Sequence, residues 1–233
     1  MDIALFTEEG LIMILRWIHF FAGVAWIGHL YYFNFVQGGF MAAVEAPVKN
    51  QAFSKLVPNA MWWFRYGALF TFLSGAAMLA IVAKDLGGEF PRSSYGIFIY
   101  TGALMGTIMF LNVWLIIWPI QRGLIANANT VIGGGAADTV AAGKAPKALL
   151  ASRTNVLFSI PLLFFMGASR HLNLNIPDDF SPGGVFAVVT LIILALEANA
   201  IKGKLGPLTT VKGVIHCGVA LLVVLYAVIE VMV

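Results

Sequence analysis

Six long apolar stretches dominate the pattern of hydrophobic and polar positions along the chain. They fall at about 11–36, 60–83, 95–120, 149–169, 184–201 and 211–233. Stretches of this length are able to cross a hydrocarbon core of ~30 Å as helices that rise ~1.5 Å per residue. The pattern therefore predicts an all-α fold, a polytopic membrane helix bundle of about six transmembrane helices. We expect one transmembrane domain over residues 1–233.

The connections between these stretches are short, with two exceptions. Residues 37–59 form a polar link that contains Pro47 and Pro58, and residues 121–148 contain the Gly/Ala-rich run 133–137. The second of these is predicted to be a flexible loop. The overall composition, 60% hydrophobic and 11% charged, fits the membrane reading and excludes a soluble protein.

The basic residues set an orientation for the predicted bundle. Ten of the fourteen lie in or beside the connections after the first, third and fifth spans: Lys49, Lys55, Arg65, Arg122, Lys144, Lys147, Arg153, Lys202, Lys204 and Lys212. The other four are Arg16, Lys84, Arg92 and Arg170. Because cytoplasmic loops of membrane proteins are enriched in Lys and Arg, both termini of this multi-pass membrane protein are predicted to lie outside.

Because membrane orientation explains the basic residues, they give no reason to expect a nucleic-acid partner. The partner expected around the spans is membrane lipid. The N-terminus is acidic (Asp2, Glu8 and Glu9), so the first apolar stretch is predicted to be a retained span and not a signal peptide. The single cysteine, Cys217, excludes a disulfide framework and a covalently attached c-type haem.

All four histidines fall in or at the edge of the predicted spans. Ionisable groups at membrane depth are rare and usually functional, and neutral imidazole is a common axial ligand of haem iron. Depth along the helices pairs His29 with His216 near the inner edge, and His19 with His171 in the outer half. We therefore expect one or two haem b groups held by these histidines, with metal binding at the haem iron.

The histidines also have a purely structural interpretation. A membrane histidine often forms only a hydrogen bond to a neighbouring helix, worth about 0.6 kcal/mol on average. His171, next to Arg170 at the end of a predicted helix, is in the right place to cap that helix.

A second group of polar and aromatic residues gathers at the predicted inner helix ends. Arg65 lies a turn inside the second span, where it is expected to face the bundle and pair with Glu197, a haem propionate or an anionic substrate. Asn112 is a buried polar group in need of a partner, and the spacing of Gly102 and Gly106 favours close helix packing. Anchoring at the membrane interface is the simpler explanation for the tryptophans. Nucleotide-binding, zinc-protease and Ser-His-Asp motifs are absent, so any chemistry is expected to be redox chemistry at a bound cofactor.

Several strings in the first four spans resemble the membrane domain of the bacterial membrane-bound urate oxidase (urate hydroxylase) family. They are Trp17-Ile18-His19, Ala25-Trp26-Ile27-Gly28, Tyr31 to Gln37, Trp62 to Gly67, Gly106 to Trp114, Ala151 to Asn155, Ser159 to Pro161 and Phe164 to Ser169. Together they cover about residues 10 to 171. More remotely, the Trp-x-His pattern is similar to haem-binding membrane protoporphyrinogen oxidases, whose first-span histidine corresponds to His19.

The resemblance implies oxidation of urate to 5-hydroxyisourate, with electrons leaving through cytochrome c. Family members typically carry a cytochrome c domain after the last span, whereas this chain stops at Val233, so a separate cytochrome c or other respiratory complex subunits are the expected partners. Joined to the pattern above, the resemblance suggests Arg65, Arg153 and Asn155 as catalytic residues. Gln37, Trp62 and Trp63 would complete the urate pocket.

Two other functions remain open from the sequence. One is a non-enzymatic b-type cytochrome or anchor subunit of a respiratory electron-transfer complex, and the other is a protoporphyrinogen-oxidising enzyme. Turnover of urate by the purified chain would distinguish a urate oxidase from a non-enzymatic cytochrome. The choice of substrate would distinguish a urate oxidase from a protoporphyrinogen-oxidising enzyme.

Overall fold

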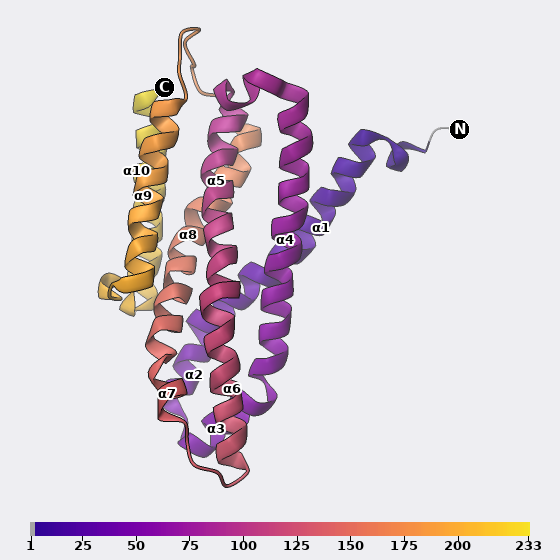
Figure 1. Ribbon diagram of the computed structural model, residues 1–233. Coiled ribbons are helices and arrows are strands. Elements are labelled where there is room, and N and C mark those ends of the chain that lie inside the picture. The colour runs from indigo at the N-terminus through magenta and orange to yellow at the C-terminus, as the bar shows by residue number, and fades with distance from the viewer. Residues whose placement is uncertain (1–2) are drawn as a thin grey trace.

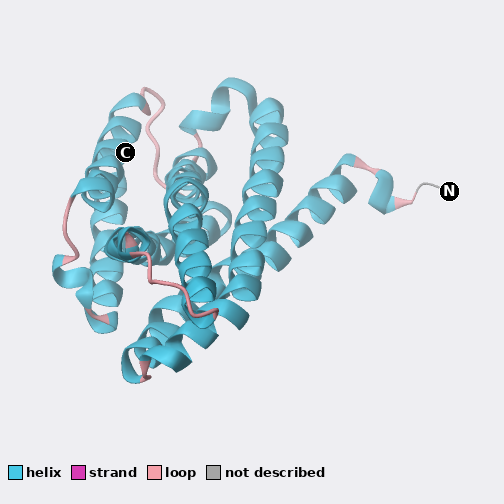
Figure 2. Ribbon diagram, turned by 60° about the horizontal axis from the view of Figure 1, so that its bottom comes forward, coloured by secondary structure: helices cyan, strands magenta, loops and turns pink. Residues whose placement is uncertain are grey.

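The computed structural model describes residues 3–233 and is helical almost throughout (Figures 1 and 2). Residues 1 and 2 lie outside the described residues, and Asp2 of the acidic N-terminus is one of them. Six continuous helical stretches are long and apolar enough to span a membrane: Glu8–Ala43, Val57–Arg92, Ser94–Ile132, Thr139–His171, Gly183–Lys202 and Val211–Met232. The predicted all-α bundle of six spans is therefore confirmed.

The first two spans and their connection contain most of the short elements. The short helix η1 (Ala4–Phe6) precedes α1 (Glu8–Tyr31), which continues through a π-helical turn, η2 (Tyr32–Gln37), into α2 (Gly38–Ala43). Then follow α3 (Ala46–Lys55), α4 (Val57–Leu86) and the 3-10 helix η3 (Gly87–Arg92). Thr7 caps α1 by accepting a hydrogen bond from the backbone of Gly10.

The remaining spans complete the bundle. The third span runs from α5 (Ser94–Leu111) through a second π-helical turn, η4 (Asn112–Ile117), into α6 (Trp118–Ile132). The short α7 (Thr139–Gly143) leads to α8 (Ala145–His171), and α9 (Gly183–Lys202), the 3-10 helix η5 (Gly206–Thr209) and α10 (Val211–Met232) follow. Both termini lie at one end of the bundle, and α2, α3 and α7 lie at the other, here called the α3 end (Figure 1).

Two connections contain more helix than the sequence predicted. The link 37–59 is mostly α2 and α3, and the prediction of a flexible loop over 121–148 was wrong for most of that range. There α6 continues to Ile132, so only residues 133–138 lie outside a helix before α7 begins. The physical reason is packing, because α3 lies against α6 and stabilises this extension beyond the apolar stretch.

α8 is the central helix of the bundle. It packs against α5, α9 and α10, and both π-helical turns contact it. Small residues permit this close packing: Gly102 and Gly106 of α5 face Met166 and Leu162, and Gly218 of α10 faces Ile160. The close helix packing predicted from the Gly102–Gly106 spacing is confirmed.

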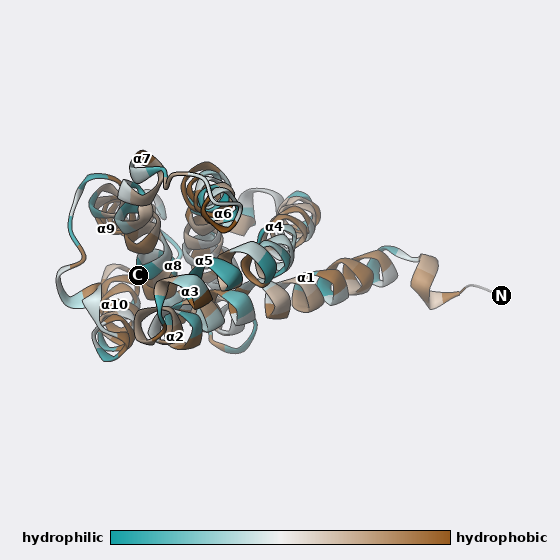
Figure 3. Ribbon diagram, turned by 90° about the horizontal axis from the view of Figure 1, so that it is seen from below, coloured by the Kyte–Doolittle hydropathy of each residue, from teal (hydrophilic) through white to brown (hydrophobic). Residues whose placement is uncertain are grey.

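α1 differs from the other spans because it packs mainly against α4. The two helices cross closely at Gly67, where an added Cβ would lie 2.9 Å from the backbone nitrogen of Trp26. The N-terminal half of α1 projects away from the bundle, and most of its residues are hydrophobic (Figure 3). Leu11, Met13 and Trp17 are exposed on this half, as expected for a helix in contact with lipid.

Candidate functional site

A layer of buried polar side chains crosses the bundle in the half that contains the α3 end. Its centre is α8, where residues 153–159 are all buried, among them Arg153, Thr154, Asn155 and Ser159. Asn34 of η2, Asn112 of η4 and Glu197 of α9 are buried beside it. Buried polar groups inside a membrane bundle are costly unless they are bonded or functional, so each needs an account of its partners.

The two π-helical turns each provide one asparagine to α8. The amide nitrogen of Asn34 donates to the carbonyl of Leu30 and to Oγ of Ser152, each at 2.8 Å. The amide nitrogen of Asn112 donates to Oδ1 of Asn155 at 3.0 Å. An inserted residue in a helix changes the direction of the following side chains, and such turns are frequent at functional sites. Here both turns lie beside one short segment of α8.

Arg153 lies between the two α8 residues that receive these hydrogen bonds. Its side chain is 8% exposed, yet its Nε and Nη1 atoms have no hydrogen-bond partner in the described part of the chain. A buried guanidinium without partners is strongly unfavourable, and an anion that accepts hydrogen bonds from these nitrogens would satisfy it. The structure therefore has an unsatisfied anion-binding group at the centre of the polar layer.

Besides Nε1 of Trp26 on α1, three other buried polar atoms lack partners among residues 3–233. They are Oε1 of Gln37, Nε of Arg65 and Nε1 of Trp114. Arg65 stacks on two aromatic rings, with its Cζ 3.8 Å from the centre of the Trp118 ring and 5.1 Å from that of Tyr66. This aromatic support holds the guanidinium plane and leaves its hydrogen-bond donors for another group.

The other predicted pocket residues have different surroundings. Asn155 is fully buried and already bonded on both sides of its amide, because Nδ2 donates to the carbonyl of Met109 at 3.0 Å. Trp62 and Trp63 are each 45% exposed and pack edge to face on one another. Trp62 also packs on Tyr66, whose ring meets Trp114, so it belongs to the aromatic group around Arg65.

The four histidines lie on three helices. His19 faces α4, with Nδ1 2.8 Å from the carbonyl of Thr71 and 3.3 Å from Oγ of Ser74. His29 bonds the carbonyl of Ala25 in its own helix at 2.7 Å. His171, at the end of α8, and His216, on α10, are both exposed. Among residues 3–233 no hydrogen bond joins two of these histidines, and the predicted pairs remain predictions.

The surroundings of His19 fit a haem ligand. Donation from Nδ1–H to the Thr71 carbonyl leaves Nε2 as the metal-binding atom, and a backbone carbonyl behind the imidazole is the usual support of such ligands. Gly75 makes room for the ring, since an added Cβ there would lie 2.9 Å from its Cε1. Among residues 3–233 no group of three or more His, Cys, Asp or Glu side chains is placed to hold a metal, but haem iron needs only one or two protein ligands.

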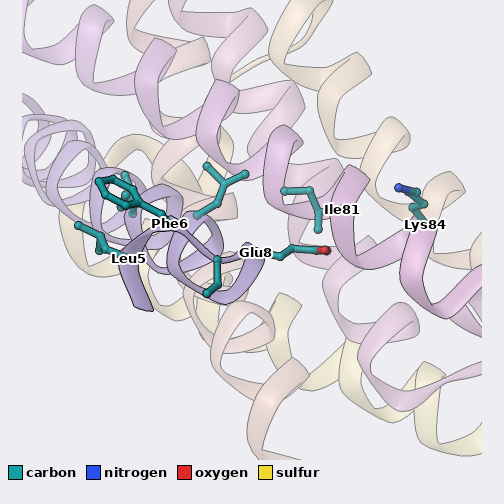
Figure 4. A pocket seen from close by; sticks show the side chains of 8 residues that line it. Leu5, Phe6, Glu8, Ile81 and Lys84 are labelled. Carbon is teal, nitrogen blue, oxygen red and sulfur yellow. The ribbon is translucent and has the colours of Figure 1, made fainter. Parts of the chain in front are cut away.

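Two surface hollows lie along α1. One, of about 570 Å³, is lined by His29, Tyr32, Asn59 and Trp63 together with Val24, Ala25, Gly28, Leu56 and Ala60. The other, of about 610 Å³, lies between the start of α1 and the end of α4, and its charged lining residues are Glu8 and Lys84 (Figure 4). Neither includes a residue of the buried polar layer.

Sequence reasoning found the two arginines but missed part of the site. Asn34, Trp114 and Trp118 were seen only as interface or family residues, and the π-helical turns that position them have no signal in the apolar pattern. Glu197 was noted as a partner for Arg65, whereas the structure places it in a hydrogen bond with Asn112. The signal that marks Glu197 is a single carboxyl group within the fifth apolar span.

Fold and site together define a class: a polytopic helical membrane protein with unsatisfied cationic and amide groups enclosed in the bundle. A family model described as urate oxidase N-terminal matches residues 91–232, more than half of the chain, and the protein belongs to that family. No curated protein and no solved structure matches the chain.

The matched region contains Asn112, Trp114, Arg153, Asn155 and Glu197, so most of the polar layer lies in the part that defines the family. It also extends through α9 and α10, beyond the motifs quoted from the first four spans. The α1 and α4 residues, among them His19 and Arg65, lie before residue 91 and outside the match.

Proposed function

We propose that the protein oxidises urate to 5-hydroxyisourate within the buried polar layer. The observation that carries this proposal is Arg153, a buried cation with two unbonded nitrogens in the part of the chain that matches the urate oxidase family. Urate is a planar anion at neutral pH, with carbonyl and N–H groups around its edge. It therefore offers hydrogen-bond acceptors and a negative charge to the guanidinium of Arg153.

The other unsatisfied atoms fit the remaining edge of such a heterocycle. Arg65 and Trp114 offer N–H donors, and Gln37 offers an acceptor for an N–H of the substrate. The elements that carry them are neighbours, since η2 and η4 contact α8 and α4 contacts η4 and α6. In this proposal Arg153 and Arg65 bind and orient the anion, Asn155 fixes the layer, and Trp62 and Trp63 shield it from the outer surface.

The proposed cofactor is haem b, one or two per chain, with His19 as the first ligand and His29, His171 and His216 as candidates for the others. Bound haem would accept the electrons of urate one at a time and pass them on. The chain itself would supply the imidazole at His19, fixed by Thr71 and Ser74. The proposed acceptor is a cytochrome c or another respiratory subunit, and the proposed location is the bacterial inner membrane.

The test uses the full chain purified in detergent, with urate and an artificial electron acceptor. Pyridine haemochrome analysis and a reduced-minus-oxidised spectrum measure haem in the same samples. Arg65→Ala is expected to abolish turnover with the haem spectrum unchanged, whereas His19→Ala is expected to lose or halve the spectrum. An unchanged rate in Arg65→Ala would contradict the pocket, and haem without any urate oxidation would favour a cytochrome that only relays electrons.

A further inference from the structure

Glu197 is the one acidic side chain buried within the described part of the bundle, and it is not among the groups proposed to bind urate. It lies on α9, five residues before the helix ends at Lys202, and its side chain is 9% exposed. A carboxyl group inside a membrane bundle is costly and is usually there for a function.

The hydrogen bonds around Glu197 have a fixed direction. The carbonyl of Met109 only accepts, so the Asn155 amide must turn its Nδ2 toward it and its Oδ1 toward Asn112. Asn112 must then present its own Nδ2, which donates both to Asn155 and to Oε2 of Glu197, each at 3.0 Å. A backbone carbonyl thus determines the orientation of two amides and makes Oε2 an acceptor.

The two carboxyl oxygens of Glu197 differ in their hydrogen bonding. Oε2 is held by Asn112, while Oε1 takes part in none of the hydrogen bonds found among residues 3–233. A proton that arrives at Glu197 will therefore bind Oε1 without breaking the network.

The proposed reaction needs such a group. Urate gains the oxygen of one water at C5, and two electrons and two protons leave. Haem held by His19 would supply the electron acceptor, and a cytochrome c or an artificial acceptor would be the final oxidant, but the protons need a base of this chain near the substrate. Arg153 stays protonated and the asparagine amides are not bases, so the buried layer contains no other group suited to accept them.

We propose that Glu197 is the proton acceptor of urate oxidation, and that Asn112 is the residue that positions it. The carboxylate takes a proton at Oε1 from the water that attacks C5 and becomes a carboxylic acid. It then releases the proton toward the end of α9, little more than one helical turn away, and accepts the second in the same way. This proposal rests on the proposed function.

The decisive variant is Glu197→Gln, which keeps the shape of the side chain and an oxygen that accepts from Asn112. The value of kcat for urate is expected to fall by about 100-fold or more, the range for loss of general acid–base catalysis, with KM changed much less. Glu197→Asp should retain part of the rate. The matched control is Glu230→Gln, which removes an exposed carboxyl group on α10 that bonds Tyr226; its rate should equal that of the wild type.

A second measurement starts from the wild type. Infrared difference spectra taken when urate is added should show a protonated carboxyl band during turnover, and the same band should shift in Glu197→Asp. If the wild type oxidises urate without such a band, or if Glu197→Gln keeps full activity, the role of Glu197 is wrong and the proposed function still stands. A wild type that does not oxidise urate would overturn the proposed function, and this role with it.

Discussion

Arg153 shows at the scale of a single residue how binding and stability are linked in this protein. Its buried nitrogens have no hydrogen-bond partner within the chain, and a buried charge without its partner costs several kcal/mol. A ligand that satisfies Arg153 recovers that energy, so the structure is expected to gain stability when the correct anion binds.

Replacement of Arg153 by Met is expected to have two opposite effects. Without urate, the thermal unfolding midpoint should stay the same or rise, since an apolar side chain of similar length replaces an unpaired buried charge. With urate at about 100 times its Kd, the wild type should gain ~2.7 kcal/mol and Arg153→Met almost nothing. Thermal unfolding in detergent with and without urate measures both. Arg122→Met, at an exposed position on α6, is the control and should respond to urate like the wild type; an equal response in Arg153→Met would contradict the assignment.

The two asparagines should be energetically coupled. Asn155→Leu leaves one Asn112 side-chain hydrogen without an acceptor and removes one hydrogen bond to the Met109 carbonyl, and a buried orphan costs about 1–3 kcal/mol. We expect the free energy of unfolding to fall by ~2 kcal/mol or more. The loss in the Asn112→Leu/Asn155→Leu double variant should be clearly smaller than the sum of the single losses. Additive losses would show that the hydrogen bond between them contributes nothing.

The sequence identified charged residues within the spans, but it did not show which of them have hydrogen-bond partners. Charged side chains within apolar spans, such as Arg65 and Glu197, are visible without any structure. Whether a partner satisfies such a group depends on which way neighbouring helices face. That is why Asn155, expected to contact substrate, turned out to be bonded to Met109 and Asn112, while Arg153 was left with unbonded nitrogens.

At the scale of elements, the crossing of α1 and α4 holds His19 in place. The crossing occurs at Gly67, and His19 contacts α4 about one turn further along at Thr71 and about two turns further along at Ser74. Glycine is required at the crossing because backbone atoms of α1 occupy the space of its missing Cβ. The geometry of the imidazole therefore depends on this contact between the two helices.

Gly67→Ala is expected to separate the two helices. The added methyl group would lie 2.9 Å from the Trp26 nitrogen and 3.1 Å from the Ala22 carbonyl oxygen, so the backbone must shift. Overpacking of this kind costs about 1–3 kcal/mol, which thermal unfolding of the purified chain would register. Gly28→Ala is the control, since its methyl group meets nothing within 4 Å. If both variants unfold at the wild-type temperature, the close crossing is not a constraint.

Prediction succeeded for whole spans and failed for their details. The length of an apolar stretch is set by the thickness of the bilayer, so the six spans follow from the sequence. The π-helical turns depend on a single inserted residue, which leaves hydropathy unchanged. The helical extension of α6 to Ile132 depends on its contact with α3, a tertiary effect that local composition does not contain.

At the scale of the whole molecule, the structure separates the ends of the bundle. Lys49 and Lys55 on α3, Lys144 and Lys147 beside α7, and the basic α9–α10 connection all belong to the side opposite the termini (Figure 1). The positive-inside rule then predicts that the α3 end faces the cytoplasm.

Cysteine labelling tests this orientation directly. Cys217 is first replaced by Ser, and a cysteine is then introduced at Lys49 or at Asp179, both exposed and at opposite ends. A membrane-impermeant maleimide added to intact spheroplasts should label Asp179→Cys at once, because that end is expected to face outward. It should label Lys49→Cys only after the membrane is opened. The reverse pattern would invert the predicted topology.

The central place of α8 has a consequence for how the protein is made. Ribosomes deliver the spans in order, so α1 and α4 are able to pair as soon as both have entered the membrane, whereas α5 and η4 must wait for α8. During that interval the Asn112 amide lies in the bilayer without Asn155, and Glu197 arrives one span later still. Assembly of the polar layer is therefore among the last steps of biogenesis, and the carboxyl group enters the membrane only after its hydrogen-bond donor is in position.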